Sequence, residues 1–302
     1  MRPVNIARLN VFTGHNDCVY TLQPSDRAHI FFSGAGDGMI VQWDITNPDE
    51  GQLIAKLPNS VYALHYQPQS KLLFAGHNYD GIHLLDWENK KEIGSLNFTK
   101  AAIFDIQSHG NRIFVACGDG SIVCVDRERL AVTETSKHSE NKTRTIAIHA
   151  KRGELAVGYS DHYIRIFDLD SLTLKQEWRA HRNSVFTLRY SPDGNYLFSG
   201  SRDARLKVWD VQAGYLQAAE VVAHMYAINH IEFSPDGKHF VTCSMDKSIK
   251  VWDTEVLQLL KVIDKARHAG HGTSVNKLLW TSFESRLLSA SDDRTISGWQ
   301  IF

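Results

Sequence analysis

Hydrophobic and polar residues alternate along most of this chain in short runs. The runs LKVW (206–209), IRIF (164–167) and IKVW (249–252) have the period of two that is typical of β-strands with alternating faces. The turn sequence SPDG occurs at 191–194 and again at 234–237, with proline and glycine where a tight reversal needs them. The pattern therefore predicts a protein built almost entirely from short antiparallel strands.

These strands belong to a repeated unit. Seven segments resemble one another, and examples are SGAGDGMIVQWD (33–44) and TCSMDKSIKVWD (242–253). Each carries an acid in its central turn, and successive acids are separated by 43, 39, 42, 42, 43 and 47 residues; the acids are Asp37, Asp80, Asp119, Asp161, Asp203, Asp246 and Asp293. Repetition along the whole chain predicts a single domain over residues 1–302, with about four strands in each unit.

One unit also contains the residue types of nucleophilic or acid/base catalysis. The stretch FSGSRDARLKVWD (198–210) holds Ser199 and Asp203, and His181 precedes it. The same arrangement, however, occurs in four units, with a histidine 22 residues before the turn acid and 28 residues before a tryptophan. A catalytic site has no reason to occur four times at one spacing, so the pattern favours a structural role.

A repeat of about 40–45 residues with four strands and a Trp-Asp ending resembles the WD-repeat β-propeller family. The resemblance implies an all-β fold, a seven-bladed β-propeller of four-stranded antiparallel blades around a central channel. The last unit has only three predicted strands, and residues 4–12 belong to no unit of their own. We therefore expect the N-terminal strand to close the ring by pairing with residues 296–301.

The resemblance also assigns a role to the recurring polar residues. In the family they form a buried hydrogen-bond chain from tryptophan to serine or threonine, then to histidine, then to the turn aspartate. The matching sets are Trp43, Ser33, His15 and Asp37; Trp209, Ser199, His181 and Asp203; Trp252, Thr242, His224 and Asp246; and Trp299, Ser289, His271 and Asp293.

The second, third and fourth units depart from this pattern. They keep the turn acids but have lost the histidine. Apolar residues stand at the serine position (Ala75, Val115, Val157) and at the tryptophan position (Leu85, Val125, Phe167). These blades are expected to depend more on apolar packing.

Composition narrows the class of protein. The 302 residues are 43% hydrophobic and 22% charged with a net charge of −1, which gives no reason to expect binding to nucleic acid or to anionic membranes. No apolar run is long enough to span a bilayer, and the four cysteines have no CxxC spacing. We expect an intracellular, cytoplasmic protein with free thiols.

Sequence motifs for cofactor or metal chemistry are absent. The chain contains no GxxxxGK[ST], HExxH or GxSxG sequence, and the densest histidine pair, His268 and His271, includes a residue already assigned to the repeat. His65, His77, His83 and His149 are scattered over ordinary strand and turn positions. No cofactor, no metal and no catalytic residue are therefore expected.

The resemblance further implies which residues face the narrow mouth of the channel. One group lies five residues after each histidine, or at the matching position: Tyr20, Tyr62, Phe104, Arg144, Phe186, Asn229 and Asn276. A second group lies just before each turn acid: Gly36, Tyr79, Gly118, Ser160, Arg202, Met245 and Asp292. Aromatic residues and arginine dominate binding energy at protein interfaces.

Two hypotheses follow for function. The first is a non-enzymatic interaction scaffold that binds a peptide or protein partner on the aromatic and arginine rim. The alternative is an enzyme that uses the channel mouth with a metal or with carboxylates. Among the expected rim residues only Asp292 is acidic and none is histidine, which favours the scaffold.

Overall fold

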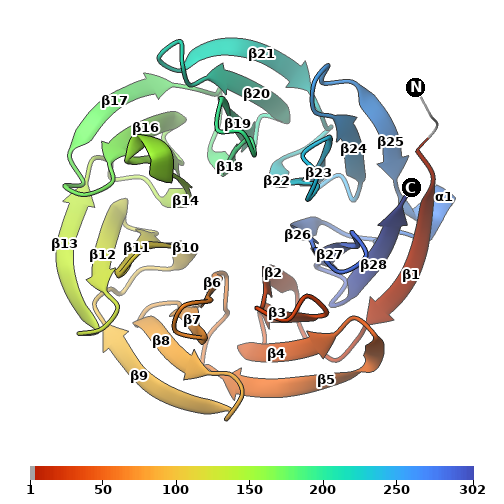
Figure 1. The fold of residues 1–302 in the computed structure, drawn as a ribbon, viewed down its shortest axis with the longest axis horizontal. Helices are drawn as coiled ribbons and strands as arrows, with labels where there is room; N and C mark the ends of the chain where they lie inside the picture. The colour runs from red at the N-terminus through yellow and green to blue at the C-terminus, as the bar shows by residue number, and fades with distance from the viewer. Residues whose placement is uncertain (1–3) are drawn as a thin grey trace.

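The computed structural model describes residues 4–302, which form seven four-stranded antiparallel sheets arranged as blades around a central channel (Figure 1). In the first six blades the strands follow chain order from the innermost to the outermost. This arrangement confirms the predicted all-β, seven-bladed propeller.

The first four blades come from residues 19–179. Blade 1 contains β2 (Val19–Pro24), β3 (Ile30–Ala35), β4 (Met39–Asp44) and β5 (Asn47–Lys56), and blade 2 contains β6 (Leu64–Gln67), β7 (Leu72–His77), β8 (Gly81–Asp86) and β9 (Lys91–Asn97). Blade 3 contains β10 (Ile103–His109), β11 (Arg112–Cys117), β12 (Ser121–Asp126) and β13 (Ala131–Lys137), and blade 4 contains β14 (Thr143–His149), β15 (Glu154–Tyr159), β16 (Tyr163–Asp168) and β17 (Leu174–Arg179).

The remaining blades complete the ring. Blade 5 contains β18 (Val185–Tyr190), β19 (Tyr196–Ser201), β20 (Arg205–Asp210) and β21 (Leu216–Val222), and blade 6 contains β22 (Ile228–Phe233), β23 (His239–Ser244), β24 (Ile249–Asp253) and β25 (Leu259–Ile263). Blade 7 contains β26 (Val275–Trp280), β27 (Leu287–Ser291), β28 (Ile296–Ile301) and β1 (Ile6–Phe12). Helical structure in residues 4–302 is confined to η1 (Ala150–Arg152) and α1 (Lys265–His268), and no helix there is long and apolar enough to cross a bilayer.

The N-terminal strand closes the ring, as predicted. β1 pairs antiparallel with β28, from Ile6 opposite Ile301 to Phe12 opposite Ile296. Phe12, the last residue of β1, is buried, and its ring meets Phe31 of blade 1 edge-on at a centroid distance of 5.1 Å. β1 therefore completes blade 7 and also packs against blade 1.

Apolar side chains between adjacent blades form the core. Seven clusters of buried residues each draw on two neighbouring blades. Phe31 packs toward blade 7, whereas the next residue, Phe32, packs toward blade 2. Because successive side chains point to opposite faces and both faces are covered, the middle strands read as continuous apolar runs.

The turn between β7 and β8 differs from the alignment made on the sequence. Counted from the paired residues of each hairpin, the position of Asp37 in blade 1 is taken by Tyr79 in blade 2, and Asp80 lies one residue later. In the other six blades the turn acid accepts the backbone N–H two residues along, as Asp37 does from Met39. Asp80 pairs with His77 instead. Treating Asp80 as the second turn acid was wrong, because strand pairing and not residue type sets the register.

Candidate functional site

A hydrogen-bond chain joins the recurring polar residues of blade 5. Trp209 Nε1 donates to Ser199 Oγ (2.9 Å), Ser199 Oγ donates to His181 Nε2 (2.8 Å), and His181 Nδ1 donates to Asp203 (3.2 Å). The same three bonds, at 2.7–3.2 Å, join Trp43, Ser33, His15 and Asp37 in blade 1, Trp252, Thr242, His224 and Asp246 in blade 6, and Trp299, Ser289, His271 and Asp293 in blade 7.

The protonation states suit a structural chain. Burial lowers the pKa of His181, which the charge and hydrogen bond of Asp203 only partly oppose. Burial raises the pKa of Asp203, but hydrogen bonds from His181 and from the backbone N–H groups of Arg182 and Arg205 outweigh it and hold this pKa below its ordinary value. A neutral imidazole thus faces an ionised carboxylate. Ser199 Oγ bonds both Trp209 and His181. Because Ser199 is fully buried, its hydroxyl is not accessible as a nucleophile.

Blades 2, 3 and 4 show no such chain in the described residues. Buried apolar side chains occupy the serine and tryptophan positions. In blade 4 the guanidinium of Arg165 bridges Asp161 (2.8 Å) and Glu177 (2.7 Å). Apolar packing and local polar contacts replace the chain in these blades.

The mouth residues are positioned by an irregularity that recurs in the innermost strands. In six blades a β-bulge leaves one residue of the innermost strand unpaired; these residues are Tyr20, Phe104, Arg144, Phe186, Asn229 and Asn276. In blade 2, β6 begins only at Leu64, and Tyr62 lies just before it. A bulge re-aims a side chain, and all seven residues of the first predicted group line one hollow of about 440 Å³ at the mouth.

Five of the seven form a continuous arc. The rings of Tyr20 and Tyr62 meet edge-on at 4.7 Å between centroids, and Tyr62 stacks on Phe104 at 5.8 Å. The Arg144 guanidinium lies 4.4 Å from the centroid of Phe104 and 5.0 Å from that of Phe186. Such aromatic and cation–π contacts are each favourable. They hold the half-buried arc in one arrangement.

The two asparagines of the group bind neighbouring strands. Asn229 Nδ2 donates to the carbonyl of Val275 (2.8 Å), and Asn276 Nδ2 donates to the carbonyl of Val19 (3.0 Å) and to Asp292 Oδ1 (2.7 Å). These bonds link blade 6 to blade 7 and blade 7 to blade 1. Their amide donors are therefore largely used within the ring.

The second predicted group is more exposed. Tyr79 and Met245 are 57% and 50% exposed, and Arg202 is exposed as well. Tyr79 lines the hollow, whereas Arg202 and Met245 do not. The other four residues of the group offer little to a partner. Gly36, Gly118 and Ser160 have small side chains or none, and the Asp292 carboxylate already accepts a hydrogen bond from Asn276.

Sequence reasoning missed two apolar residues near Met245. Met225 is 82% exposed and Tyr226 is 61% exposed, in the loop before β22. This loop touches the turn that carries Met245, whose backbone N–H donates to the carbonyl of Ala227 (3.1 Å). The periodic pattern does not reveal these residues, because they are consecutive loop residues. Their place directly after His224 of the repeat was the one signal in the sequence that could have found them.

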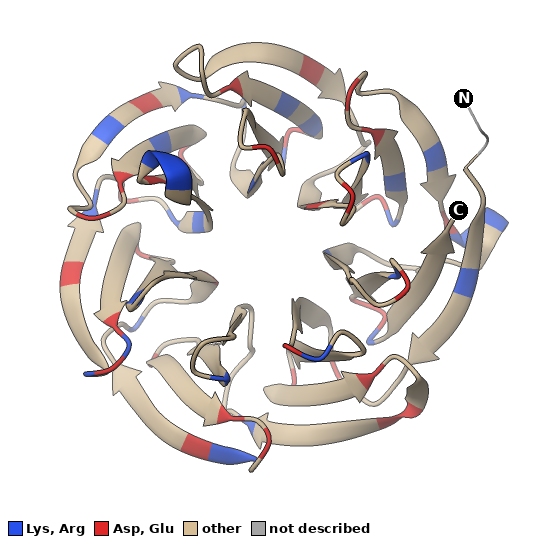
Figure 2. Ribbon diagram, viewed as in Figure 1, with Lys and Arg blue, Asp and Glu red and all other residues tan. Residues whose placement is uncertain are grey.

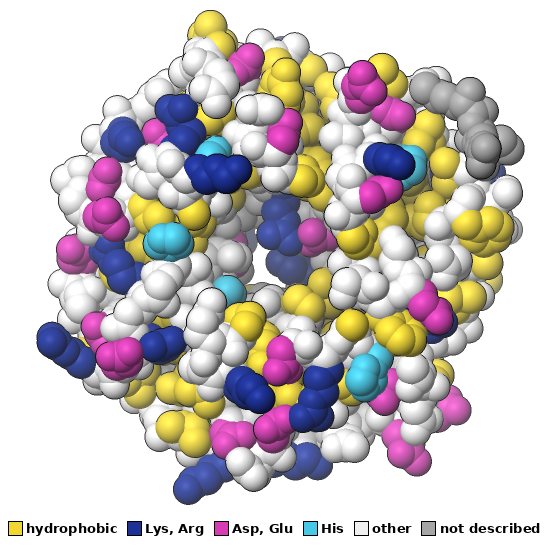
Figure 3. Space-filling model, in the orientation of Figure 1, with side chains coloured by type: hydrophobic (Ala, Val, Ile, Leu, Met, Phe, Trp, Pro, Cys, Tyr) yellow, Lys and Arg dark blue, Asp and Glu magenta, His cyan; other side chains and the backbone are white. Residues whose placement is uncertain are grey.

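Charged residues also line the channel further in, around a cavity of about 120 Å³. Arg189 pairs with Glu232, and Asp105 accepts from the backbone N–H of Ile146 (2.8 Å). Lys277 also lines this cavity, and burial lowers the pKa of its amine. Figure 3 shows basic and acidic side chains at the centre of the ring.

Sequence reasoning found only Asp292 as an acid near the channel, and no histidine. The structure adds Asp105, Glu232 and His230, which were missed because they lie one to three residues further along the innermost strands than the positions considered. Both carboxylates are already bonded within the protein.

The cations at the mouth have no acidic partner. Among residues 4–302, no carboxylate lies within ion-pair distance of Lys142, Arg144 or Arg202. Lys142 lines the hollow, and Arg144 donates to Ser160 (2.9 Å). Burial and then the charge of Arg202 lower the pKa of Arg144. Over the rest of the ring, Figure 2 shows basic and acidic residues interspersed.

Fold and site together define a repeat β-propeller with a preformed aromatic mouth. The family model described as "WD domain, G-beta repeat" matches residues 7–44, 172–210, 217–253 and 263–300. The chain belongs to this WD40 family. The four matches fall on blades 1, 5, 6 and 7, which are the blades that contain the hydrogen-bond chain.

Individual proteins are also similar to this chain over about two thirds of its length. The chain is 24% identical over 218 residues to the WD repeat-containing protein 91 homolog of Dictyostelium discoideum, covering 69% of this chain and 28% of that protein. It is 24% identical over 220 residues to the 66 kDa stress protein of Physarum polycephalum, covering 70% and 35%. The chain thus spans about a third of the length of these curated relatives.

A solved structure shows the same fold over nearly the whole chain. The WD40 β-propeller domain of Doa1 superposes with a TM-score of 0.86, covering 98% of this chain and 97% of that one at 14% identity. WD40 propellers are typically protein-interaction scaffolds and generally lack enzymatic activity.

Proposed function

We propose that this chain is a non-enzymatic scaffold that binds a peptide segment or protein partner at the channel mouth. The observation that carries the proposal is the arc of Tyr20, Tyr62, Phe104, Arg144 and Phe186, which surrounds a hollow of about 440 Å³. Side chains held in place by stacking lose little conformational freedom when a ligand binds. The arc therefore suits a binding site.

The charges indicate the chemistry of the partner. Lys142, Arg144 and Arg202 have no carboxylate partner among the described residues, so an incoming carboxylate or carbonyl oxygen gains interactions without displacing an ion pair. The aromatic faces add apolar contact area. A segment that combines acidic residues with an apolar side chain fits both features.

The alternative of an enzyme in the channel has less support. The carboxylates that the structure adds there are bonded within the protein, Asp105 to a backbone N–H and Glu232 to Arg189. An enzyme would have to break these contacts to use either group as an acid or base. The scaffold requires no such rearrangement.

The test begins with a displayed library of random peptides selected on the parent chain. We expect the selected peptides to be enriched in aspartate or glutamate beside an apolar residue. The affinity of one such peptide is then measured for Phe104→Ala and Arg144→Ala. Each substitution should weaken binding about 30-fold, because truncated interface anchors cost about 2 kcal/mol.

Leu216→Ala is the matched control, because Leu216 is an apolar residue 68% exposed on the outer strand β21. It should bind the peptide like the parent, and melting curves should show that all variants are folded. Equal affinity of the parent and of both mouth variants would contradict the proposal, since the peptide would then contact another surface.

A further inference from the structure

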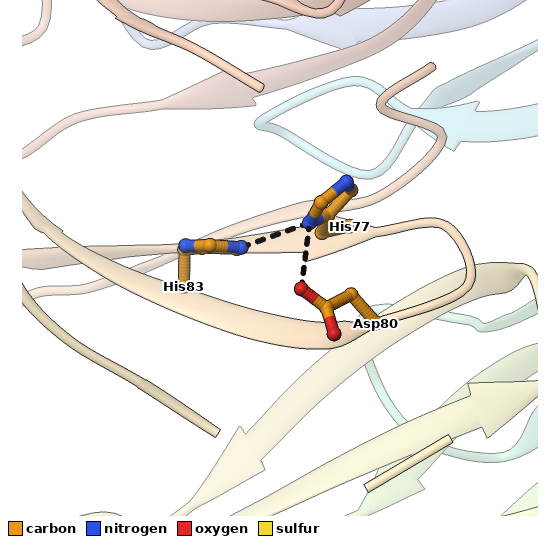
Figure 4. A group of neighbouring side chains, drawn as sticks. All are labelled: His77, Asp80 and His83. Atoms are coloured by element: carbon orange, nitrogen blue, oxygen red, sulfur yellow. Dashed lines mark hydrogen bonds and ion pairs between the residues drawn. The ribbon is translucent and has the colours of Figure 1, made fainter. Parts of the chain in front are cut away.

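Three potential metal ligands converge in the hairpin between β7 and β8. His77 Nδ1 lies 3.0 Å from His83 Nε2 and 3.4 Å from Asp80 Oδ2, and the three ligand atoms all lie within 4.8 Å of one another. Figure 4 shows one imidazole nitrogen of His77 joined by dashed lines to both of the other side chains. His77 is buried, whereas His83 and Asp80 are partly exposed, so the group is open to solvent on one side.

Neighbouring residues orient these ligands. His83 Nδ1 lies 3.0 Å from Glu92 Oε1 on β9, which places the proton on Nδ1 and leaves the lone pair of Nε2 directed at His77. A carboxylate behind a histidine is the usual outer partner of a metal-bound imidazole. Asn97 donates to the second oxygen of Asp80 and holds that carboxylate in the turn.

The repeat does not account for this group. In the blades with the hydrogen-bond chain, the histidine precedes the innermost strand and bonds a hydroxyl and the turn aspartate, and that hydroxyl also accepts from an indole. In blade 2 the corresponding positions are Ala75 and Leu85, and both histidines come from the hairpin itself. Two imidazoles facing each other nitrogen to nitrogen therefore need another explanation.

We propose that His77, Asp80 and His83 bind a divalent transition-metal ion, with Zn²⁺ as the best match. Ligands about 2.0–2.1 Å from a tetrahedral ion are about 3.3–3.4 Å apart, close to the two distances measured from His77. Imidazole nitrogen favours zinc, cobalt or nickel over magnesium and calcium. Three protein ligands leave the fourth position for water.

Binding requires His77 to change its tautomer. His77 coordinates through Nδ1 and carries its proton on Nε2, which lies 3.3 Å from the side-chain amide of Asn59. Rotation of that amide by half a turn brings its oxygen to accept the proton. The site lies in the turn that carries Tyr79, so an ion there would also hold this mouth residue in place.

The test uses the full chain after removal of metal with EDTA. Titration with Co²⁺ should give one equivalent of bound ion with visible absorption, and Zn²⁺ should displace it. His83→Gln should abolish the absorption, and Glu92→Gln should weaken Zn²⁺ binding by about 10- to 100-fold because it removes the outer partner. His109→Gln, at an exposed histidine, is the control and should bind like the parent.

Asp80→Asn serves as a second variant if His83→Gln does not fold. The proposal is overturned if the parent gives no cobalt absorption, or if the absorption persists unchanged in the folded ligand variants. The latter result would place the ion on other surface histidines.

Discussion

Removing a single oxygen atom from blade 5 tests the hydrogen-bond chain most directly. In Ser199→Ala, Trp209 Nε1 loses its acceptor at 2.9 Å and His181 Nε2 loses its donor at 2.8 Å. Ser199 is fully buried, so water cannot replace the hydroxyl. Each orphaned buried group costs about 1–3 kcal/mol, which predicts a loss of about 2–6 kcal/mol in the free energy of unfolding.

Equilibrium urea denaturation, followed by tryptophan fluorescence, measures this loss. Ser282→Ala, at an exposed serine of the loop before β27, is the control and should change the free energy of unfolding by less than about 0.5 kcal/mol. Trp209→Phe removes one of the same bonds, so its effect should overlap with that of Ser199→Ala by about 0.5–3 kcal/mol in the double variant. A loss below about 1 kcal/mol, or full additivity, would refute the chain as a stabilising unit.

Two further predictions concern ring closure and pH. Deleting residues 1–12 should lower Tm by more than about 10 °C in a thermal melt, because the loss of the buried Phe12 side chain alone costs about 3–5 kcal/mol and the pairing of β1 with β28 is also lost. An unchanged melting curve would contradict closure of the ring by β1. Burial lowers the pKa of His15, His181 and His224, so below about pH 6.5 the unfolded chain binds protons that the folded chain does not. The free energy of unfolding should therefore fall on acidification, by up to about 1.4 kcal/mol per pH unit for each of these histidines. The free energy of unfolding, measured by urea denaturation at several pH values, should therefore change less steeply with pH in His181→Gln than in the parent.

The fold was predictable because the sequence repeats the groups that define it. A buried set such as His181, Ser199, Trp209 and Asp203 is satisfied in only one geometry, so its spacing recurs without variation and reveals the blade. Where the set is missing, as in blade 2, residue types were the only guide. The alignment there slipped by one residue at Asp80.

The sequence by itself determined the number of repeats and the strands within them, because these depend on local periodicity and fixed spacing, and its resemblance to the WD-repeat family implied which residues lie at the mouth. Outside the hydrogen-bond chains, tertiary structure alone decided which side chains meet. The stacking of Tyr62 on Phe104, the Arg189–Glu232 pair inside the channel and the approach of His77 to His83 depend on bulges, blade rotation and turn shape. The first two join residues about 40 positions apart on different blades, and strand alternation does not specify how one blade is turned against the next.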